Sequence, residues 1–126
     1  MNENKISIIT VVRNDKTNIR ATINSVLSQT YSSIEYIVID GASMDGTLDI
    51  IREYENQIAE LISEPDKGVY DAMNKGTAIA TGKWICYMNS GDQFADTDVL
   101  YRIFIDNKNN VLDKDVIYSD VIADYK

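Results

Sequence analysis

Four aspartates recur along this chain at nearly constant intervals, and their side chains are the best candidates for chemistry. Asp15, Asp40, Asp66 and Asp92 are spaced 25, 26 and 26 residues apart. A carboxylate can ligate a divalent cation, accept hydrogen bonds from a ligand or cap a helix. The chain has no histidine, which excludes Ser-His-Asp and Cys-His catalysis. Any metal would therefore take oxygen ligands, as Mg²⁺, Mn²⁺ and Ca²⁺ do.

The hydrophobic pattern places each of these aspartates after a strand. Apolar runs predict strands over residues 6–12, 34–39, 61–62, 83–88 and 116–118. Helical spacing of apolar residues predicts helices over residues 19–27, 47–58 and 69–80, and a fourth around residues 100–104. Gly82 is the expected stop of the third helix. Alternating strands and helices indicate an α/β protein, a three-layer α/β/α sandwich around a mainly parallel sheet.

The carboxyl ends of parallel strands share one edge of the sheet, which is where open α/β sheets bind ligands. Each strand–helix unit therefore returns an aspartate to that edge. Asp40 and Asp92 sit directly where apolar strands end, and we predict a functional role for them. For Asp15 and Asp66 we favour capping of the following helix.

Composition narrows the class of protein. A chain of 126 residues with 44% hydrophobic residues fits one globular domain, residues 1–126. A net charge of −8 argues against nonspecific binding to nucleic acid or to an anionic membrane. Cys86 lies in an apolar run and is expected to be structural. The sequence has no recognisable signal peptide or membrane span, which predicts a cytoplasmic location, with the inner face of the membrane as the alternative.

Several known functional motifs are either incomplete or absent in this sequence. Gly41 and Gly46 have the spacing of a P-loop, but Thr47 stands where that loop requires lysine. No GxGxxG follows a strand, and no GxSxG occurs. The string DGTL at residues 45–48 resembles that of haloacid-dehalogenase-type phosphatases, but Ser43 replaces the required nucleophilic aspartate. The remaining chemistry suits a metal-bound nucleoside diphosphate derivative, with Asp92 as metal ligand and Asp40 as hydrogen-bond acceptor.

Five segments carry a resemblance to a known family. In order they read SIITVVRN, SVLSQTY, YIVIDGASMDGT, EPDKGVYDAMNKG and ATGKWICYMNSGD. Together they resemble the ordered motifs of family 2 glycosyltransferases over about residues 6–105. The resemblance implies an inverting enzyme with a GT-A fold, a Rossmann-like nucleotide-diphospho-sugar transferase fold that is truncated here.

The resemblance also implies a set of site residues. A divalent metal, Mn²⁺ or Mg²⁺, would be bound by Asp92 and Asn89 and stabilise the leaving nucleoside diphosphate. The expected nucleotide-binding residues are Val11, Arg13, Asp40, Ser43, Asp45, Lys67, Asn74 and Ser90.

Some positions depart from the family pattern. Arg13 stands where the family often has tyrosine, and Gly41 replaces a second acid after Asp40. Met73 replaces an arginine expected near phosphate, for which Lys67 or Lys75 is a candidate substitute. One carboxylate, Asp92, remains of the usual acidic motif, so metal binding should depend more on the phosphates of the substrate.

Family members are longer, and their catalytic base lies in their second half. We therefore expect a donor-binding fragment whose base lies beyond Lys126. Its expected partners are a nucleotide-sugar donor and a saccharide or lipid-linked acceptor in cell-surface polysaccharide synthesis, and not nucleic acid. Apolar surface left by a missing half would favour self-association. The alternative hypothesis is a non-catalytic α/β module that binds a nucleotide or a protein partner.

Overall fold

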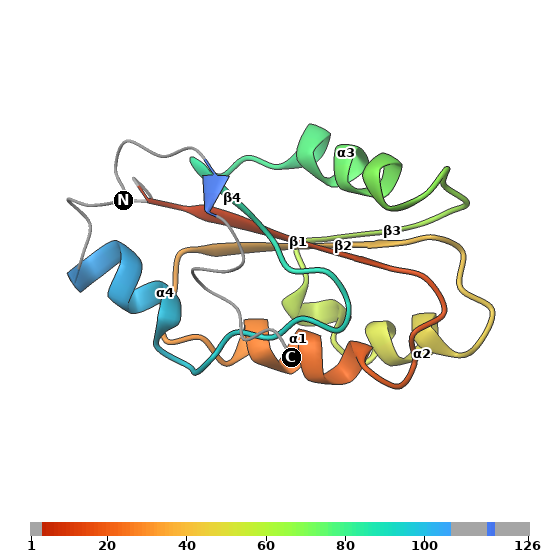
Figure 1. Cartoon of the computed structure of the whole chain (residues 1–126), viewed down its shortest axis with the longest axis horizontal. Coiled ribbons are helices and arrows are strands. Elements are labelled where there is room, and N and C mark those ends of the chain that lie inside the picture. The colour runs from red at the N-terminus through yellow and green to blue at the C-terminus, as the bar shows by residue number, and fades with distance from the viewer. Residues whose placement is uncertain (1–3, 107–115, 118–126) are drawn as a thin grey trace.

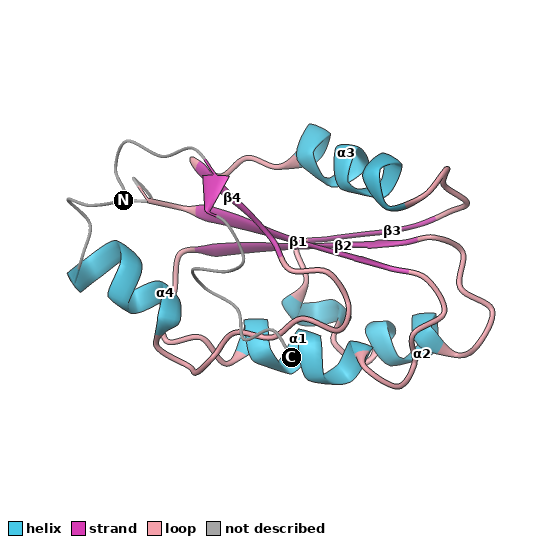
Figure 2. Ribbon diagram, viewed as in Figure 1, coloured by secondary structure: helices cyan, strands magenta, loops and turns pink. Residues whose placement is uncertain are grey.

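The computed structural model describes residues 4–106 and 116–117 of the chain (Figure 1). Helices and strands alternate along it, and a parallel sheet lies between two helical layers (Figure 2). The strands are β1 Ile6–Val12, β2 Ile34–Asp40, β3 Glu60–Ser63, β4 Trp84–Tyr87 and β5 Val116–Ile117. The helices are α1 Ile19–Leu27, α2 Thr47–Arg52, α3 Val69–Ile79 and α4 Val99–Tyr101. A 3₁₀ turn covers Glu55–Gln57, and a π-helical turn over Arg102–Asp106 continues α4.

The five strands form one sheet in the order β3-β2-β1-β4-β5, and every neighbouring pair is parallel. The central strand β1 pairs with β2 along its whole length, from Ile6 opposite Ile34 to Val12 opposite Asp40. All strands therefore end at the same edge, and the loops that follow them meet there. This confirms the predicted three-layer α/β fold.

Side chains of β1 alternate between two apolar cores, because successive residues of a strand point to opposite faces. Ile6, Ile8 and Val12 pack into the larger core, beneath α1, α2 and α4. Ile9 and Val11 pack into the smaller core, beneath α3. Figure 1 shows α3 alone on one face of the sheet and the other labelled helices on the opposite face. Burial on both faces explains why the strand sequences are continuously apolar.

Two glycines allow close packing around β1. A Cβ at Gly76 of α3 would lie 2.6 Å from Cγ2 of Ile9, so α3 could not approach the sheet as closely with a larger residue. A Cβ at Gly82 would lie 2.7 Å from the backbone nitrogen of Ser7. Gly82 therefore serves the contact with β1. The prediction that it stops α3 was wrong, since α3 ends at Ile79 and Ala80 is already extended.

The other boundaries differ modestly from the predictions. The second helix ends at Arg52, short of the predicted residue 58, and Tyr54 precedes a 3₁₀ turn. The strand predicted over residues 83–88 is Trp84–Tyr87, and residue 118 of the last predicted strand lies outside the described residues. Cys86 is buried as predicted, and burial raises the pKa of its thiol. Within the described residues, no helix has both the length and the apolar character needed to cross a membrane.

Candidate functional site

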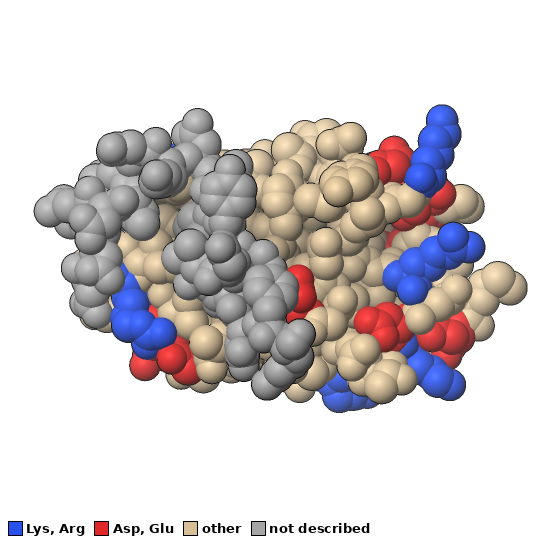
Figure 3. All heavy atoms as spheres, viewed as in Figure 1, with Lys and Arg blue, Asp and Glu red and all other residues tan. Residues whose placement is uncertain are grey.

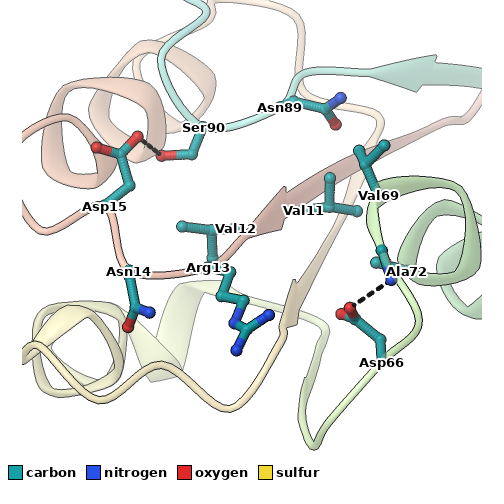
Figure 4. A pocket seen from close by; sticks show the side chains of 11 residues that line it. Val11, Val12, Arg13, Asn14, Asp15, Asp66, Val69, Ala72, Asn89 and Ser90 are labelled. Carbon is teal, nitrogen blue, oxygen red and sulfur yellow. Dashed lines mark hydrogen bonds between the residues drawn. The ribbon is translucent and has the colours of Figure 1, made fainter.

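A pocket of about 340 Å³ opens at the carboxyl edge of the sheet. It is formed by the loops that follow β1, β3 and β4, together with the first turn of α3 (Figure 4). Val11, Val12, Val69 and Ala72 give it an apolar surface. The remaining lining residues are Arg13, Asn14, Asp15, Asp66, Gly68, Asn89 and Ser90. The topology thus places the predicted ligand edge and the cavity at the same location.

The loop after β4 enters the pocket as a tight turn. The backbone N–H of Asp92 donates to the carbonyl of Asn89 at 2.9 Å, and Gly91 has φ 101°. A positive φ at the third residue is what a type II turn requires, and glycine adopts it without strain. Thr22 of α1 fixes the turn, because its hydroxyl accepts the Gly91 N–H at 3.0 Å and donates to the Asp92 carbonyl at 2.9 Å.

Asp15 joins the loops that follow β1 and β4. Its Oδ2 accepts the hydroxyl of Ser90 at 2.8 Å (Figure 4), and its Oδ1 accepts the side-chain amide of Asn18 at 3.0 Å. The predicted capping role falls to its backbone carbonyl, which accepts the N–H groups of Asn18 and Ile19 at the start of α1. Asp15 itself belongs to the pocket lining, which the spacing of the aspartates along the sequence did not indicate.

Side-chain oxygens from the loop after β2 hold the loop after β1 in place. The successive backbone N–H groups of residues 14, 15 and 16 donate to Ser43 Oγ, Thr47 Oγ1 and Asp45 Oδ2, respectively. In return, Asn14 Oδ1 accepts the N–H of Met44 at 2.7 Å. We call these four hydrogen bonds the β1–β2 clasp. It holds Asn14 in the left-handed region at φ 51° and sets the path of the wall that carries Arg13.

Asp40 lies behind this wall and is fully buried. Its carboxylate accepts the N–H of Ser43 at 3.1 Å, the hydroxyl of Ser43 at 2.6 Å and the hydroxyl of Ser63 at 2.7 Å. These donors replace the hydrogen bonds to water that a buried carboxylate loses. The carboxylate of Asp45 also accepts hydrogen bonds from its own loop, because Thr47 donates to it from both its hydroxyl and its backbone N–H. These bonds lower the pKa of Asp45.

The cations near the pocket differ in whether they are already paired. Arg13 lines the pocket and makes no ion pair or hydrogen bond with another described residue. The ammonium group of Lys67 is exposed and equally unpaired among the described residues. Lys75 is engaged, at 2.9 Å from Glu64 and 3.0 Å from the carbonyl of Pro65. Of the two lysines proposed to replace the missing arginine, Lys67 is therefore the one that is free.

The predicted metal ligands supply two oxygen donors. Asn89 lines the pocket, and its Oδ1 is buried without a hydrogen-bond partner in the described structure. Asp92 is half-buried beside it in the same turn, and this burial raises the pKa of its carboxyl group. No group of three or more acidic, histidine or cysteine side chains gathers as a metal site within residues 4–106 and 116–117. The unpartnered oxygen fits a cation, provided that a bound ligand and water complete the coordination.

The structure thus divides the predicted site residues into two sets. Those that line the pocket are Val11, Arg13, Asn89 and Ser90. Those that lie outside its lining are Asp40, Ser43, Asp45, Lys67, Asn74 and Asp92. Asn74 is exposed on α3. Ligand contacts by either set stay predictions. The other lining residues were not predicted as site residues, although the regular spacing of aspartates already included two of them; they are Val12, Asn14, Asp15, Asp66, Gly68, Val69 and Ala72.

The family model for glycosyl transferase family 2 matches residues 7–120 of this chain. The chain belongs to glycosyl transferase family 2. A PGL/p-HBAD biosynthesis glycosyltransferase from Mycobacterium bovis (strain BCG / Pasteur 1173P2) is 35% identical over 121 residues, which are 92% of this chain and 46% of the relative. The UDP-Glc:alpha-D-GlcNAc-diphosphoundecaprenol beta-1,3-glucosyltransferase WfaP from Escherichia coli is 32% identical, over 94% of this chain and 51% of WfaP. The chain therefore spans about half the length of these family 2 relatives.

Solved structures share the fold of this chain. The mannosyltransferase PcManGT from Pyrobaculum calidifontis, solved in complex with GDP-Man and Mn²⁺, superposes with a TM-score of 0.70 at 24% identity, over 76% of this chain and 30% of PcManGT. S. aureus TarS 1–349, in complex with UDP, superposes with a TM-score of 0.69 at 25% identity, over 83% of this chain and 33% of TarS. The predicted GT-A fold is thereby confirmed.

Proposed function

We propose that this chain binds the nucleotide-diphosphate-sugar donor of a family 2 glycosyltransferase in the pocket at the carboxyl edge of its sheet. The observation that carries the proposal is the pocket itself. It combines an apolar wall with the unpaired guanidinium of Arg13 and the turn that holds Asn89. An apolar surface suits a flat base, and polar groups around it suit a ribose and a diphosphate. Its place in a family 2 chain supports the same assignment.

The chain's own residues would orient the donor in three ways. Val12, Val69 and Ala72 would pack against the base, and Arg13 would donate hydrogen bonds to it or to phosphate. Ser90, fixed by Asp15, would face the ligand from the other side. The buried Asp40 would act through Ser43, keeping the wall that bears Arg13 in place.

A divalent cation, Mn²⁺ or Mg²⁺, would be held by Asn89, Asp92 and the diphosphate. When bound, it supplies Lewis-acid stabilisation of the departing nucleoside diphosphate. The charges support this part of the proposal, because the lining contains one cationic residue, Arg13, and two carboxylates, Asp15 and Asp66. The lining residues therefore carry a formal charge of about −1, which does not by itself attract a diphosphate.

The complete reaction would be inverting sugar transfer. An acceptor hydroxyl would attack the anomeric carbon, the bond to the diphosphate would break, and a carboxylate would take the hydroxyl proton. We propose that this base lies beyond Lys126 and that residues 1–126 form the donor-binding domain. The acceptor would be a saccharide or a lipid-linked saccharide of a cell-surface polysaccharide. Location at the inner face of the membrane and self-association are further expectations of this proposal.

A thermal-shift panel tests donor binding. The ligands are UDP, GDP, CMP and dTDP, each with and without Mn²⁺. A nucleotide present at 100 times its Kd should stabilise the fold by about 2.7 kcal/mol. We expect one nucleotide to raise the Tm, and Arg13→Ala to reduce that shift. Lys83→Ala is the matched control, because Lys83 is exposed at the opposite edge, where β4 begins. A Tm that no nucleotide changes would refute donor binding and favour a non-catalytic module.

A further inference from the structure

A buried hydroxyl closes the second half of the turn that carries Asn89 and Asp92. Thr22 of α1 is fully buried, and its Oγ1 accepts the N–H of Gly91 at 3.0 Å while it donates to the carbonyl of Asp92 at 2.9 Å. A hydroxyl has one proton to donate, and Thr22 uses it on this turn. The backbone of Gly91 and Asp92 is thereby fixed relative to α1.

A second buried hydroxyl holds the residue that precedes the turn. Thr10 of β1 is fully buried and donates to the carbonyl of Met88 at 2.6 Å. Because this bond uses the only proton of Thr10, the hydroxyl of Tyr36 at 2.8 Å must donate to Thr10. The carbonyl of Met88 belongs to the peptide group that joins it to Asn89. Thr10 therefore fixes the entry into the turn, as Thr22 fixes its end.

The backbone of the turn is thus held by hydrogen bonds, whereas its metal-ligating side chains are not. The N–H of Ser90 donates to the carbonyl of Val11 at 3.1 Å, and the N–H of Asp92 donates to the carbonyl of Asn89 at 2.9 Å. By contrast, Oδ1 of Asn89 is buried without a hydrogen-bond partner among the described residues. Ligand groups on a fixed frame need little rearrangement when a cation binds.

A fixed frame distinguishes between divalent cations that differ in size and geometry. Mg²⁺ requires a near-octahedral set of oxygens at about 2.0–2.1 Å, whereas Ca²⁺ accepts about six to eight oxygens at about 2.3–2.6 Å in flexible arrangements. Groups that orient the ligands of a metal without touching it typically change its affinity by about 10- to 100-fold. Loss of such a group should therefore weaken Mg²⁺ more than Ca²⁺.

We propose that Thr22 and Thr10 are positioning residues, which hold Asn89 and Asp92 in the arrangement that favours Mg²⁺ over Ca²⁺. This inference rests on the proposed cation site and specifies its selectivity. The turn supplies a single carboxylate, so its preference depends on how well the two ligand side chains are oriented rather than on accumulated charge.

Calorimetric titrations with UDP and with GDP, each in Mg²⁺, in Ca²⁺ or in EDTA, test the selectivity. The measured quantity is the Mg²⁺ preference, which is the nucleotide affinity in Mg²⁺ divided by that in Ca²⁺. The wild type should show a Mg²⁺ preference of about tenfold or more. Thr22→Val keeps the shape of the side chain but removes both hydrogen bonds to the turn. It should lower the Mg²⁺ preference to less than about threefold, because the Mg²⁺ effect is lost and the Ca²⁺ effect is largely kept.

Two variants of α1 separate this role from stability alone. Thr22→Ser restores the hydroxyl and should restore the Mg²⁺ preference. Ser25→Ala is the matched control, because Ser25 lies one turn further along α1 and its Oγ accepts the N–H of Phe94 at 2.6 Å, beyond the metal-binding turn. This variant should lose stability in urea denaturation but keep the Mg²⁺ preference of the wild type.

A second pair of variants keeps the test valid if Thr22→Val folds poorly. Thr10→Val removes the hydrogen bond to the carbonyl of Met88 and should also lower the Mg²⁺ preference. Tyr36→Phe is its control, because it removes the hydroxyl that donates to Thr10 but leaves the bond from Thr10 to Met88 in place. Its Mg²⁺ preference should equal that of the wild type.

The outcomes distinguish this inference from the proposed function. If a cation strengthens nucleotide binding but the Mg²⁺ preference is the same in the wild type, Thr22→Val and Thr10→Val, the cation site stands and the role of the two threonines is refuted. A wild type that binds nucleotide equally well in Ca²⁺ and in Mg²⁺ would refute it too. If neither nucleotide binds the wild type, or if no cation strengthens binding, the proposed cation site itself is refuted, and the inference with it.

Discussion

At the scale of single residues, substitution by alanine should have different consequences at Gly41 and at Gly82. An alanine Cβ at position 41 meets the end of the Asp66 side chain, whereas at position 82 it meets the backbone of Ser7 and of Lys5. A side-chain tip can rotate away, but a strand backbone cannot move without disturbing the sheet. Gly41→Ala should therefore cost less than about 1 kcal/mol of folding free energy and weaken nucleotide binding. Gly82→Ala should cost about 1–3 kcal/mol.

Urea denaturation and nucleotide titration of both variants measure this difference. Each variant serves as the control for the other, because both substitutions add the same methyl group. If Gly41→Ala binds nucleotide as tightly as the wild type, then the place of Asp66 over Gly41 has no bearing on the ligand. If Gly82→Ala is as stable as the wild type, the close contact with β1 does not constrain the fold.

At the same scale, the family resemblance named more of the pocket lining than the aspartates at the strand ends did, since neither Asp40 nor Asp92 lies in the lining. Val11, Arg13, Asn89 and Ser90, which the family resemblance implied as site residues, lie in this lining, because the parallel pairing brings the ends of β1 and β4 together. Their contacts with a ligand stay predictions. The pattern could not reveal which way a carboxylate points. Asp40 turns inward to the Ser43 donors, and Asp66 turns toward the cavity.

At the scale of elements, the β1–β2 clasp is the main support of the pocket wall. Ser43 is central to it, because its hydroxyl donates to the buried Asp40 at 2.6 Å and accepts the N–H of Asn14 at 2.8 Å. Ser43→Ala removes a donor from a buried carboxylate, which should lower the free energy of unfolding by about 1–3 kcal/mol. Urea denaturation measures the change, and Ser43→Thr should restore most of it by restoring the hydroxyl.

Ser28→Ala is the matched control for the clasp. Ser28 is an exposed serine just after α1, and its hydroxyl makes only a 3.4 Å contact with the carbonyl of Ser25. Its loss should change stability by less than about 0.5 kcal/mol. Equal stability of the wild type and Ser43→Ala would mean that solvent replaces the Ser43 hydroxyl without cost, contrary to the burial of Asp40.

Strands were easier to predict than helix ends, for a reason visible in the second helix. Apolar residues continue at helical spacing through Tyr54 and Ile58, and both pack against the larger core as the pattern implies. The backbone nevertheless leaves the α-helix after Arg52 and passes through a 3₁₀ turn. Periodicity reports which side chains face the core, and an irregular segment can satisfy that requirement as well as a helix.

At the scale of the whole molecule, charge decides how a diphosphate can bind. The chain carries a net charge of −8, and the pocket lining contributes two acids against one arginine. Figure 3 shows acidic and basic side chains gathered at the right-hand end of the view, the end toward which the strands run in Figure 1. Coulomb repulsion between these acids and a diphosphate is weakened by solvent and salt, but it is not reversed. A cation that accompanies the ligand would reverse it.

The excess of acidic over basic groups predicts that Mn²⁺ affects the binding of a nucleotide more than the binding of its nucleoside. With Mn²⁺ in place of EDTA, the affinity for UDP should rise by about tenfold or more, equivalent to about 1.4 kcal/mol. Uridine carries no phosphate, so its affinity should change less than about twofold. Calorimetric titrations at constant ionic strength measure both. Asp92→Ala should reduce the Mn²⁺ effect on UDP and leave uridine unaffected. If UDP binds equally well in EDTA, then Arg13 and Lys67 suffice to neutralise the diphosphate, and the proposed metal is not required for donor binding.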